Sequence, residues 1–188
     1  MPTINGRACV VNGKPVDKVF SDGRQVYGRN LLKGTSEPFV MGWGIPNTTW
    51  DETNQVSGIS LPVKFTYSEV LPQGTGFPYK YMPGVTYTQS IYISTDAPLT
   101  GTPISFTWYN DNYGHNTLGA ANLVKVSTNV YRATGTLTWP SSNYPAIVRN
   151  CDLINLAQVF DFTKGTFLQF YKPKLELGTT ATPWTPAP

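Results

Sequence analysis

Residues 85–94 have the sequence VTYTQSIYIS, in which mostly large side chains alternate with mostly small, hydroxyl-bearing ones. In an extended chain, Tyr87, Gln89, Ile91 and Ile93 share one face, whereas threonine, serine and Tyr92 side chains share the other. Such alternation is typical of a β-strand with one face buried. Residues 130–139 repeat it, because Thr134, Thr136 and Thr138 alternate there with Ala133, Gly135 and Leu137.

Similar segments recur along the chain between residue 34 and the C-terminus, separated by glycine, proline and asparagine. Further strands are predicted at 38–43, 60–67, 103–109, 121–127, 145–150, 153–162 and 166–176. Strands at this density favour a sandwich of two antiparallel sheets. Residues 153–160 would also fit one or two helical turns, and the tail 178–188 is expected to be extended and peripheral.

The composition supports an all-β protein. Hydrophobic residues make up 40% of the 188 residues and charged residues only 13%, against about 25% charged in an average soluble protein. Low charge argues against disorder and against coiled coils. The 17 glycines and 16 prolines indicate many turns. No apolar run is long enough to span a membrane, and the N-terminus lacks the pattern of a signal peptide.

The N-terminal segment contains a short internal echo. Residues 12–16 (NGKPV) and 22–26 (DGRQV) share the form Asx-Gly-basic-x-Val, and Asx-Gly pairs favour tight hairpin turns. We therefore expect a small β-meander of three strands over residues 1–28. It has one face to bury and should act as a connector to the main body, a neighbouring subunit or a larger assembly.

Basic residues are concentrated in the same part of the chain. Residues 1–33 carry a net charge of +4, whereas residues 34–188 carry −1. The main body therefore lacks the basic stripe of a nucleic-acid-binding surface. The basic excess either makes the small module soluble or contacts an acidic partner.

Residues suited to catalysis or metal binding are few. The two cysteines, Cys9 and Cys151, are predicted to be free thiols of a protein made in a reducing cytosol, with one cross-link between them left open. His115 is the single histidine, and no hydrolase elbow, phosphate-binding loop or dinucleotide fingerprint is present. The eleven acidic residues are scattered. The chain is therefore not expected to be an enzyme.

Aromatic side chains lie close to predicted turns, together with polar side chains. Aromatic rings offer flat apolar surfaces to sugar C–H groups, while amide, carboxylate and imidazole groups bond hydroxyls. His115 lies in a predicted loop, where a histidine is more often a local hydrogen-bonding residue than a ligand contact, and several of the rings are expected to pack in the core. The candidate ligand-binding residues are Trp43, Trp50, Trp108, Tyr109, Asn110, Asp111, Asn112, Tyr113, His115, Trp139 and Tyr144.

Three parts of the sequence resemble known families. Residues 11–20 (VNGKPVDKVF) and 25–36 (QVYGRNLLKGTS) look like the opening of tail and baseplate proteins from phages of lactic acid bacteria. Residues 171–188 (YKPKLELGTTATPWTPAP) are similar to the closing segment of carbohydrate-binding modules in those proteins. Residues 85–94 and 131–138 resemble the jelly-roll modules grouped with xylan- and glucan-binding domains.

The resemblance implies a jelly-roll carbohydrate-binding module over residues 29–188, carried on a virion tail. It would bind cell-wall polysaccharide of a Gram-positive host without catalysis, and the meander would contact other tail or baseplate subunits; whether the chain forms a homo-oligomer stays open. Family jelly rolls often hold a structural calcium, for which Glu37 and Glu176 are the matching acids, although Pro173-Lys174 replaces the usual aspartate. The alternatives are a structural spacer of the tail and, less favoured, a polysaccharide hydrolase.

Overall fold

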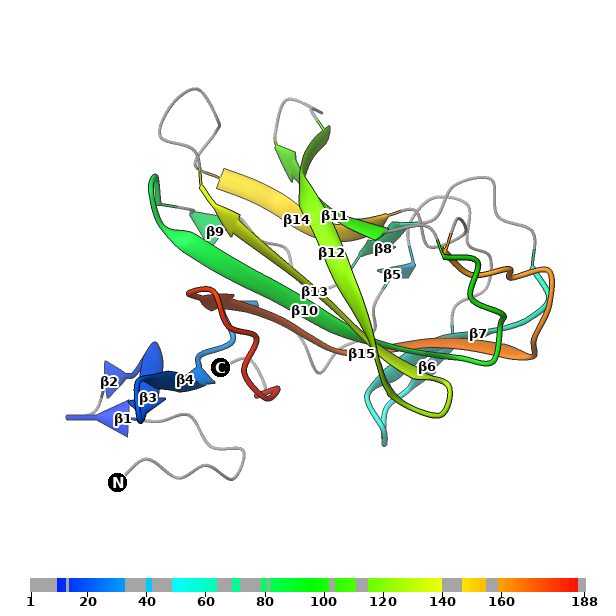
Figure 1. The fold of residues 1–188 in the computed structure, drawn as a ribbon, viewed down its shortest axis with the longest axis horizontal. Coiled ribbons are helices and arrows are strands. Elements are labelled where there is room, and N and C mark those ends of the chain that lie inside the picture. Colours follow the sequence, from blue (N-terminus) through cyan, green and yellow to red (C-terminus); the bar gives the residue numbers. More distant parts are fainter. Residues whose placement is uncertain are drawn as a thin grey trace.

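The computed structural model describes most of the chain, and its regular structure is almost wholly β-strand (Figure 1). The described residues are 10–12, 14–32, 40–41, 49–63, 69–71, 79–80, 82–101, 104–110, 115–139, 147–154 and 159–185. Within these ranges no helix is long and apolar enough to cross a membrane.

Two short hairpins precede the main body. β1 (Val10–Val11) pairs with β2 (Lys14–Pro15), and β3 (Lys18–Ser21) pairs with β4 (Arg24–Gly28). The strands of the main body are β5 (Val40–Met41), β6 (Thr49–Asp51), β7 (Val56–Ser60), β8 (Glu69–Leu71), β9 (Tyr79–Lys80), β10 (Thr86–Thr95), β11 (Ile104–Asn110), β12 (His115–Ser127), β13 (Val130–Thr138), β14 (Ile147–Ile154) and β15 (Phe167–Leu177).

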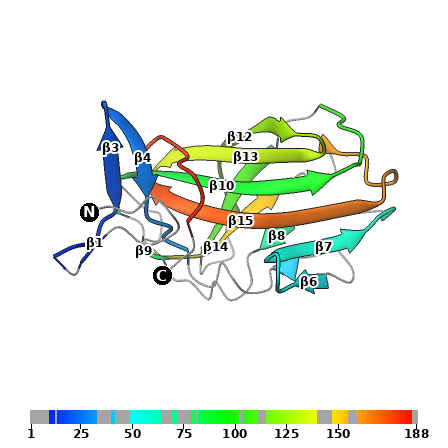
Figure 2. The ribbon, with the colours of Figure 1, turned by 90° about the horizontal axis from the view of Figure 1, so that it is seen from below.

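The main body is an antiparallel β-sandwich, as predicted, and its order of strands is consistent with a jelly roll. One layer has the order β6-β7-β15-β10-β13-β12, and the other has β12-β11-β14-β8-β5 with β9 beside β14. The long strand β12 belongs to both layers, because its first half pairs with β11 and its second half with β13. Figures 1 and 2 show β11 and β14 on one side of the layer that contains β10 and β15.

Two hydrophobic clusters form the described core. The larger cluster includes Ile91, Ile93 and Phe170, and it is closed by Phe160, whose ring lies 5.2 Å from Tyr131 in an edge contact. The smaller cluster contains Leu32, Tyr87, Trp139 and Leu175. The inward face predicted for β10 is therefore confirmed, since Tyr87, Gln89, Ile91 and Ile93 are all buried.

Several predicted strand boundaries are wrong. β12 begins at His115 instead of residue 121, and β7 ends at Ser60, where a strand over 60–67 was expected. β14 ends at Ile154, so 153–162 is not one strand. The later apolar residues of that range are buried outside a strand: Val159 is helical, and Phe160 forms an isolated β-bridge with Leu99. The apolar residues of this range therefore reflect burial in the core and not a continuous β-strand.

The prediction that the N-terminal strands form one three-stranded meander is wrong. Both predicted turns occur, with positive φ at Asn12 (51°), Asp22 (49°) and Gly23 (74°), as tight hairpin turns with Asx-Gly require. However, the middle strand is divided, and the result is two separate hairpins. Pro15 ends β2 because proline has no N–H to donate to a ladder. Asp17 lies between the two hairpins. Its backbone and carboxylate oxygens accept hydrogen bonds from Arg29, the residue that follows β4.

Candidate functional site

A bulge in β15 decides which side chains lie on the outer face of the β6-to-β12 layer, that is, the face turned away from the hydrophobic core. The register between β10 and β15 shifts between Ser90 and Tyr92, and Lys172 in the bulge has a φ of 55°. Tyr171 and Lys174, an odd number of residues apart, therefore both lie opposite outer-face residues of β10. The bulge divides the outer face into two regions.

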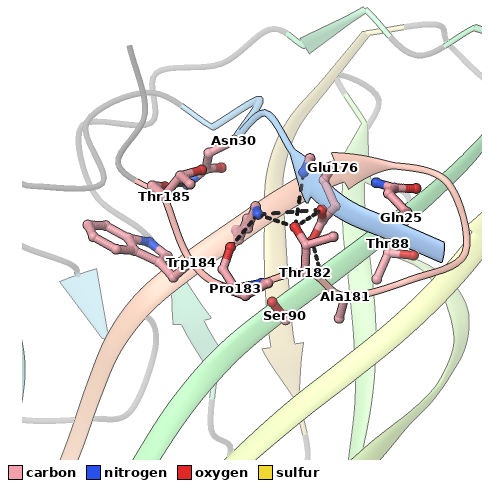
Figure 3. A network of polar contacts seen from close by, with 12 residues as sticks. Gln25, Asn30, Thr88, Ser90, Glu176, Ala181, Thr182, Pro183, Trp184 and Thr185 are labelled. Carbon is pink, nitrogen blue, oxygen red and sulfur yellow. Dashed lines mark hydrogen bonds and ion pairs between the residues drawn. The ribbon is translucent and has the colours of Figure 1, made fainter. Parts of the chain in front are cut away.

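The first region is covered by the C-terminal tail, residues 178–185. This tail was expected to be peripheral, but Thr182 is only 2% exposed and lies over Lys174 and Glu176 of β15. Figure 3 shows the tail running beside β15, with Thr182 close to Glu176. The outer residues Thr88 and Ser90 are consequently buried as well.

The hydroxyl of Thr182 is the centre of a buried polar network. Its Oγ1 accepts bonds from Lys174 Nζ at 2.6 Å and from the Gly28 backbone N at 3.1 Å, and it donates to Glu176 Oε2 at 2.5 Å. Glu176 Oε1 accepts from Thr182 N at 2.9 Å, and the Lys174 ammonium lies 3.4 Å from Oε2. One hydroxyl thus connects β4, β15 and the tail (Figure 3).

Asn30 completes the attachment of the tail. Its Nδ2 donates to the carbonyl oxygens of Pro173 (2.9 Å) and Thr185 (3.1 Å), while its Oδ1 accepts from the backbone N of Leu32 and Leu175. The segment after β4 and the end of the chain are therefore fixed to the same part of β15.

The second region of the outer face is less covered by the described tail than the first, and it carries a row of side chains that we call the tyrosine row: Val124, Arg132, Tyr92, Tyr171 and Val56. These residues are direct neighbours in register across β12, β13, β10, β15 and β7. All five are at least partly exposed. The rings of Tyr92 and Tyr171 stack with centroids 5.4 Å apart and planes inclined by 24°.

Two cations lie against these rings. Arg132 Cζ is 5.4 Å from the Tyr92 centroid, and Lys172 Nζ is 5.9 Å and 5.8 Å from the centroids of Tyr92 and Tyr171. Arg132 also donates to Ala181 O, Thr182 O and Ser90 Oγ, so the tail holds it in place. Burial raises the pKa of Tyr171, with a smaller contribution from Tyr92, so its phenol stays protonated at neutral pH.

The phenol hydroxyls of the tyrosine row are available to a ligand. Within the described ranges, neither Tyr92 nor Tyr171 has a hydrogen-bond partner for its hydroxyl. The exposed Gln169 and the half-buried Ser94 lie opposite each other on the next outer positions of β15 and β10. The row therefore offers apolar ring carbon, two hydroxyls and two cations on one surface.

Most predicted site residues lie outside the residues described, or their side chains do. Trp43, Asp111, Asn112, Tyr113, Tyr144 and Glu37 fall outside the described ranges. Trp108, Tyr109 and Asn110 belong to β11, and the backbone of Tyr109 lies opposite that of His115. His115 is the first residue of β12, so the prediction that it lies in a loop is wrong.

Three other predicted site residues have described side chains. Trp139 is 3% exposed in the smaller core cluster, so the prediction that its ring faces a ligand is wrong. Trp50 is half-buried on the edge strand β6, opposite the buried Ser57. Glu176 is fully buried and paired with Lys174, whose positive charge disfavours a calcium ion beside that carboxylate. No cluster of three metal-ligating side chains occurs in the described part of the chain.

Sequence reasoning missed the tyrosine row, although one signal pointed to it. Tyr92 is the aromatic residue on the threonine- and serine-bearing face of residues 85–94. An aromatic side chain on an otherwise polar strand face is a candidate for binding. Tyr171 gave no such signal, because the bulge at Lys172 reverses the alternation after it.

No protein-family model matches the chain, and no curated protein matches it. Solved structures with a similar fold include the tripod of the baseplate of bacteriophage Tuc2009, with 19% identity, a TM-score of 0.47, and coverage of 85% of this chain and 58% of that chain. A structure described as "CBM4 structure and function" has 17% identity, a TM-score of 0.45 and coverage of 66% and 72%. The CBM22-1 xylan-binding domain of Paenibacillus barcinonensis Xyn10C has 10% identity, a TM-score of 0.37 and coverage of 81% and 94%.

Proposed function

We propose that this chain is a non-catalytic saccharide-binding module of a phage tail protein, and that the tyrosine row contacts cell-wall polysaccharide of a Gram-positive host. One observation carries the proposal: Tyr92 and Tyr171 stack on the part of the outer face that the described tail covers less. Large, partly exposed rings beside polar side chains suit the recognition of sugars, whose rings have apolar C–H edges and many hydroxyls.

The chemistry of the tyrosine row fits weak and repeated binding. Aromatic side chains supply contact area at a small cost in conformational entropy. The phenol hydroxyls and Gln169 can bond sugar hydroxyls, and Lys172 can approach an oxygen of the ligand from above the ring pair. Several copies on one virion would increase the overall affinity through avidity.

The phage context depends on the sequence resemblance of residues 11–36 and 171–188. Adhesion to the host would follow if the module is displayed on the tail with its outer face accessible. The main alternative is a structural spacer of the tail that binds no ligand, and a polysaccharide hydrolase is the third candidate.

A glycan array and pull-down on host cell walls test the proposal with the full chain. We expect binding, and we expect Tyr92→Ala and Tyr171→Ala each to weaken it about tenfold, which corresponds to about 1.4 kcal/mol. Leu99→Ala is the matched control, because Leu99 is also apolar and exposed (52%) but lies outside the row. Binding to no glycan and no cell wall would favour the spacer, and release of reducing sugar would favour the hydrolase.

The residues Trp108, Tyr109, Asn110 and His115 stay a second candidate site, on the opposite layer. Trp108→Ala in the same binding assay tests it. If this variant loses binding while the two tyrosine variants keep it, the saccharide lies on the β11–β12 side of the module.

A further inference from the structure

A cleft lies between the β3–β4 hairpin and the main body, away from the tyrosine row. One wall is the hairpin, with Lys18, Phe20, Arg24 and Gln25, and the other is the tail loop at 178–180. Val85 and Thr86, at the start of β10, also line it. Its volume is about 690 Å³, which lies within the range of about 300–1,000 Å³ usual for small-molecule sites.

Direct contacts fix the walls of this cleft. Gln25 Nε2 donates to Leu177 O at 3.1 Å, and Gly178 N donates to Thr86 O at 2.8 Å. The Gly28 backbone is held to the tail through Thr182. The hairpin is therefore anchored to β15 and the tail on one side of the cleft, and the cleft is a built feature of the fold.

The lining of the cleft is cationic. Lys18 Nζ lies 3.7 Å from the position that a Cβ on Gly178 would occupy, so its ammonium is beside the loop wall. Arg24 lines the same space, and among the described lining residues there is no acidic side chain. Over the residues described, neither Lys18 nor Arg24 forms an ion pair.

Three described acidic residues of the hairpins and of β15 are engaged with other groups or do not line the cleft. Asp17 pairs with Arg29 at 2.8 Å, and Asp22 lies on the exposed turn beside Ser21. Glu176 is buried behind Gly28 with Lys174 and Thr182. Two cations therefore face the cleft without a carboxylate of the described chain to neutralise them, which favours an anionic ligand.

The remaining lining indicates what carries the anionic group. Phe20 lines the cleft with an apolar ring that is 59% exposed. Thr179 and Thr180 add exposed hydroxyls on the opposite wall. An apolar ring, hydroxyls and two cations together match a sugar that bears a phosphate or a carboxylate.

We propose that this cleft is a second binding site, which takes a saccharide with an anionic substituent: Lys18 and Arg24 bind the anion, and Phe20 packs against the sugar ring. The class of ligand rests on the proposed function, whereas the cleft and its cationic lining are observed independently of it. A polysaccharide with charged substituents could then occupy the cleft and the tyrosine row independently.

Calorimetric titration of the full chain with glucose 6-phosphate, glucuronate and glucose tests the proposal. We expect both anionic sugars to bind more tightly than glucose, with an affinity that falls as salt is added. Lys18→Gln and Arg24→Gln should each weaken binding of the anionic sugars at least about fivefold, corresponding to about 1 kcal/mol. Lys125→Gln, at an exposed position on β12, is the matched control.

Three results would overturn the proposal. Equal affinity for glucose 6-phosphate and glucose would show that charge is not recognised. Equal affinity for inorganic phosphate and glucose 6-phosphate would show that the sugar is not recognised. Displacement of the sugar phosphate by a polyglutamate peptide at equal concentration would indicate an acidic protein partner.

The failure of this proposal is distinguishable from the failure of the proposed function. Tyr92→Ala and Tyr171→Ala should leave the binding of glucose 6-phosphate unchanged, whereas Phe20→Ala should weaken it. If only the tyrosine variants lose the binding of glucose 6-phosphate, the anionic sugar binds at the tyrosine row and the cleft has no ligand.

Discussion

The substitution Thr182→Val removes one buried oxygen atom and keeps the shape of the side chain. That oxygen accepts from Lys174 Nζ and Gly28 N and donates to Glu176 Oε2, at 2.6, 3.1 and 2.5 Å. Without it, a buried ammonium, a buried amide and a buried carboxylate would each lack one hydrogen bond. A water molecule could not take the place of the hydroxyl, because a methyl group of the valine would fill that space.

The magnitude follows from the partners. A hydrogen bond to a charged group contributes about 1.5–3 kcal/mol and one between neutral groups about 0.5–1.5 kcal/mol. Because the three bonds share one atom and are not additive, we expect Thr182→Val to lower the free energy of unfolding by about 4 kcal/mol. In a domain of this size each kcal/mol lowers Tm by roughly 2–4 °C, so Tm should fall by about 8–16 °C.

Equilibrium unfolding in urea and thermal unfolding followed by circular dichroism measure the effect. Thr180→Val is the matched control, because Thr180 is exposed on the same tail, and its effect should stay within about 0.5 kcal/mol. Thr182→Ser keeps the hydroxyl and loses one methyl group, so it should cost about 1 kcal/mol. A loss below about 1 kcal/mol for Thr182→Val, or equal destabilisation by serine and valine, would show that the hydroxyl is not the source of this stability.

Three further predictions concern charge and backbone. Burial lowers the pKa of Lys174 to about 8 from 10.5, so the unfolded chain binds more protons between these values. The free energy of unfolding should therefore rise with pH across that window, by up to about 3 kcal/mol relative to Lys174→Met. Bonds from the backbone and hydroxyl of Thr166 lower the pKa of Asp96 below its ordinary value of 3.8. Asp96→Asn should therefore lower Tm at pH 7, and its effect should shrink as the pH falls below 3.8, where the unfolded chain takes up the proton before the folded chain does. Gly28→Ala should lower Tm and loosen the hairpin in hydrogen exchange, because its Cβ would lie 1.9 Å from Glu176 Oε2; unchanged protection of β3 and β4 would contradict it.

Alternation along the strands was enough to predict their faces where the ladder is regular. Residues 86–95 and 130–138 form β10 and β13, paired from Thr86↔Thr138 to Ser94↔Val130 without a break. The Asx-Gly turns were predictable for the same reason, since Asp22 and Gly23 need only their own backbone preferences to take positive φ. These signals are local and survive in any tertiary context.

Trp139 shows where local reasoning failed. It lies beside a predicted turn, yet its backbone bonds with Val85 and Gly84 hold it in the cluster with Tyr87 and Leu175. Nothing in the neighbouring sequence distinguishes a ring beside a turn that packs inward from one that packs outward. The outcome depends on Leu32 and Leu175, which are far away in the sequence.

The sequence alone determined that this chain is an antiparallel β-sandwich with a hairpin-containing N-terminus, because alternation, turn residues and low charge are properties of short segments. Which aromatic rings remain partly exposed, and how the ends of the chain are held, depends on contacts that form only when the chain is folded. The bulge at Lys172 brings Tyr171 beside Tyr92, and Thr182 joins β4 to the tail over a buried lysine–glutamate pair. Both features arise from contacts between segments distant in sequence, where the burial of a polar group depends on what another segment supplies to satisfy it.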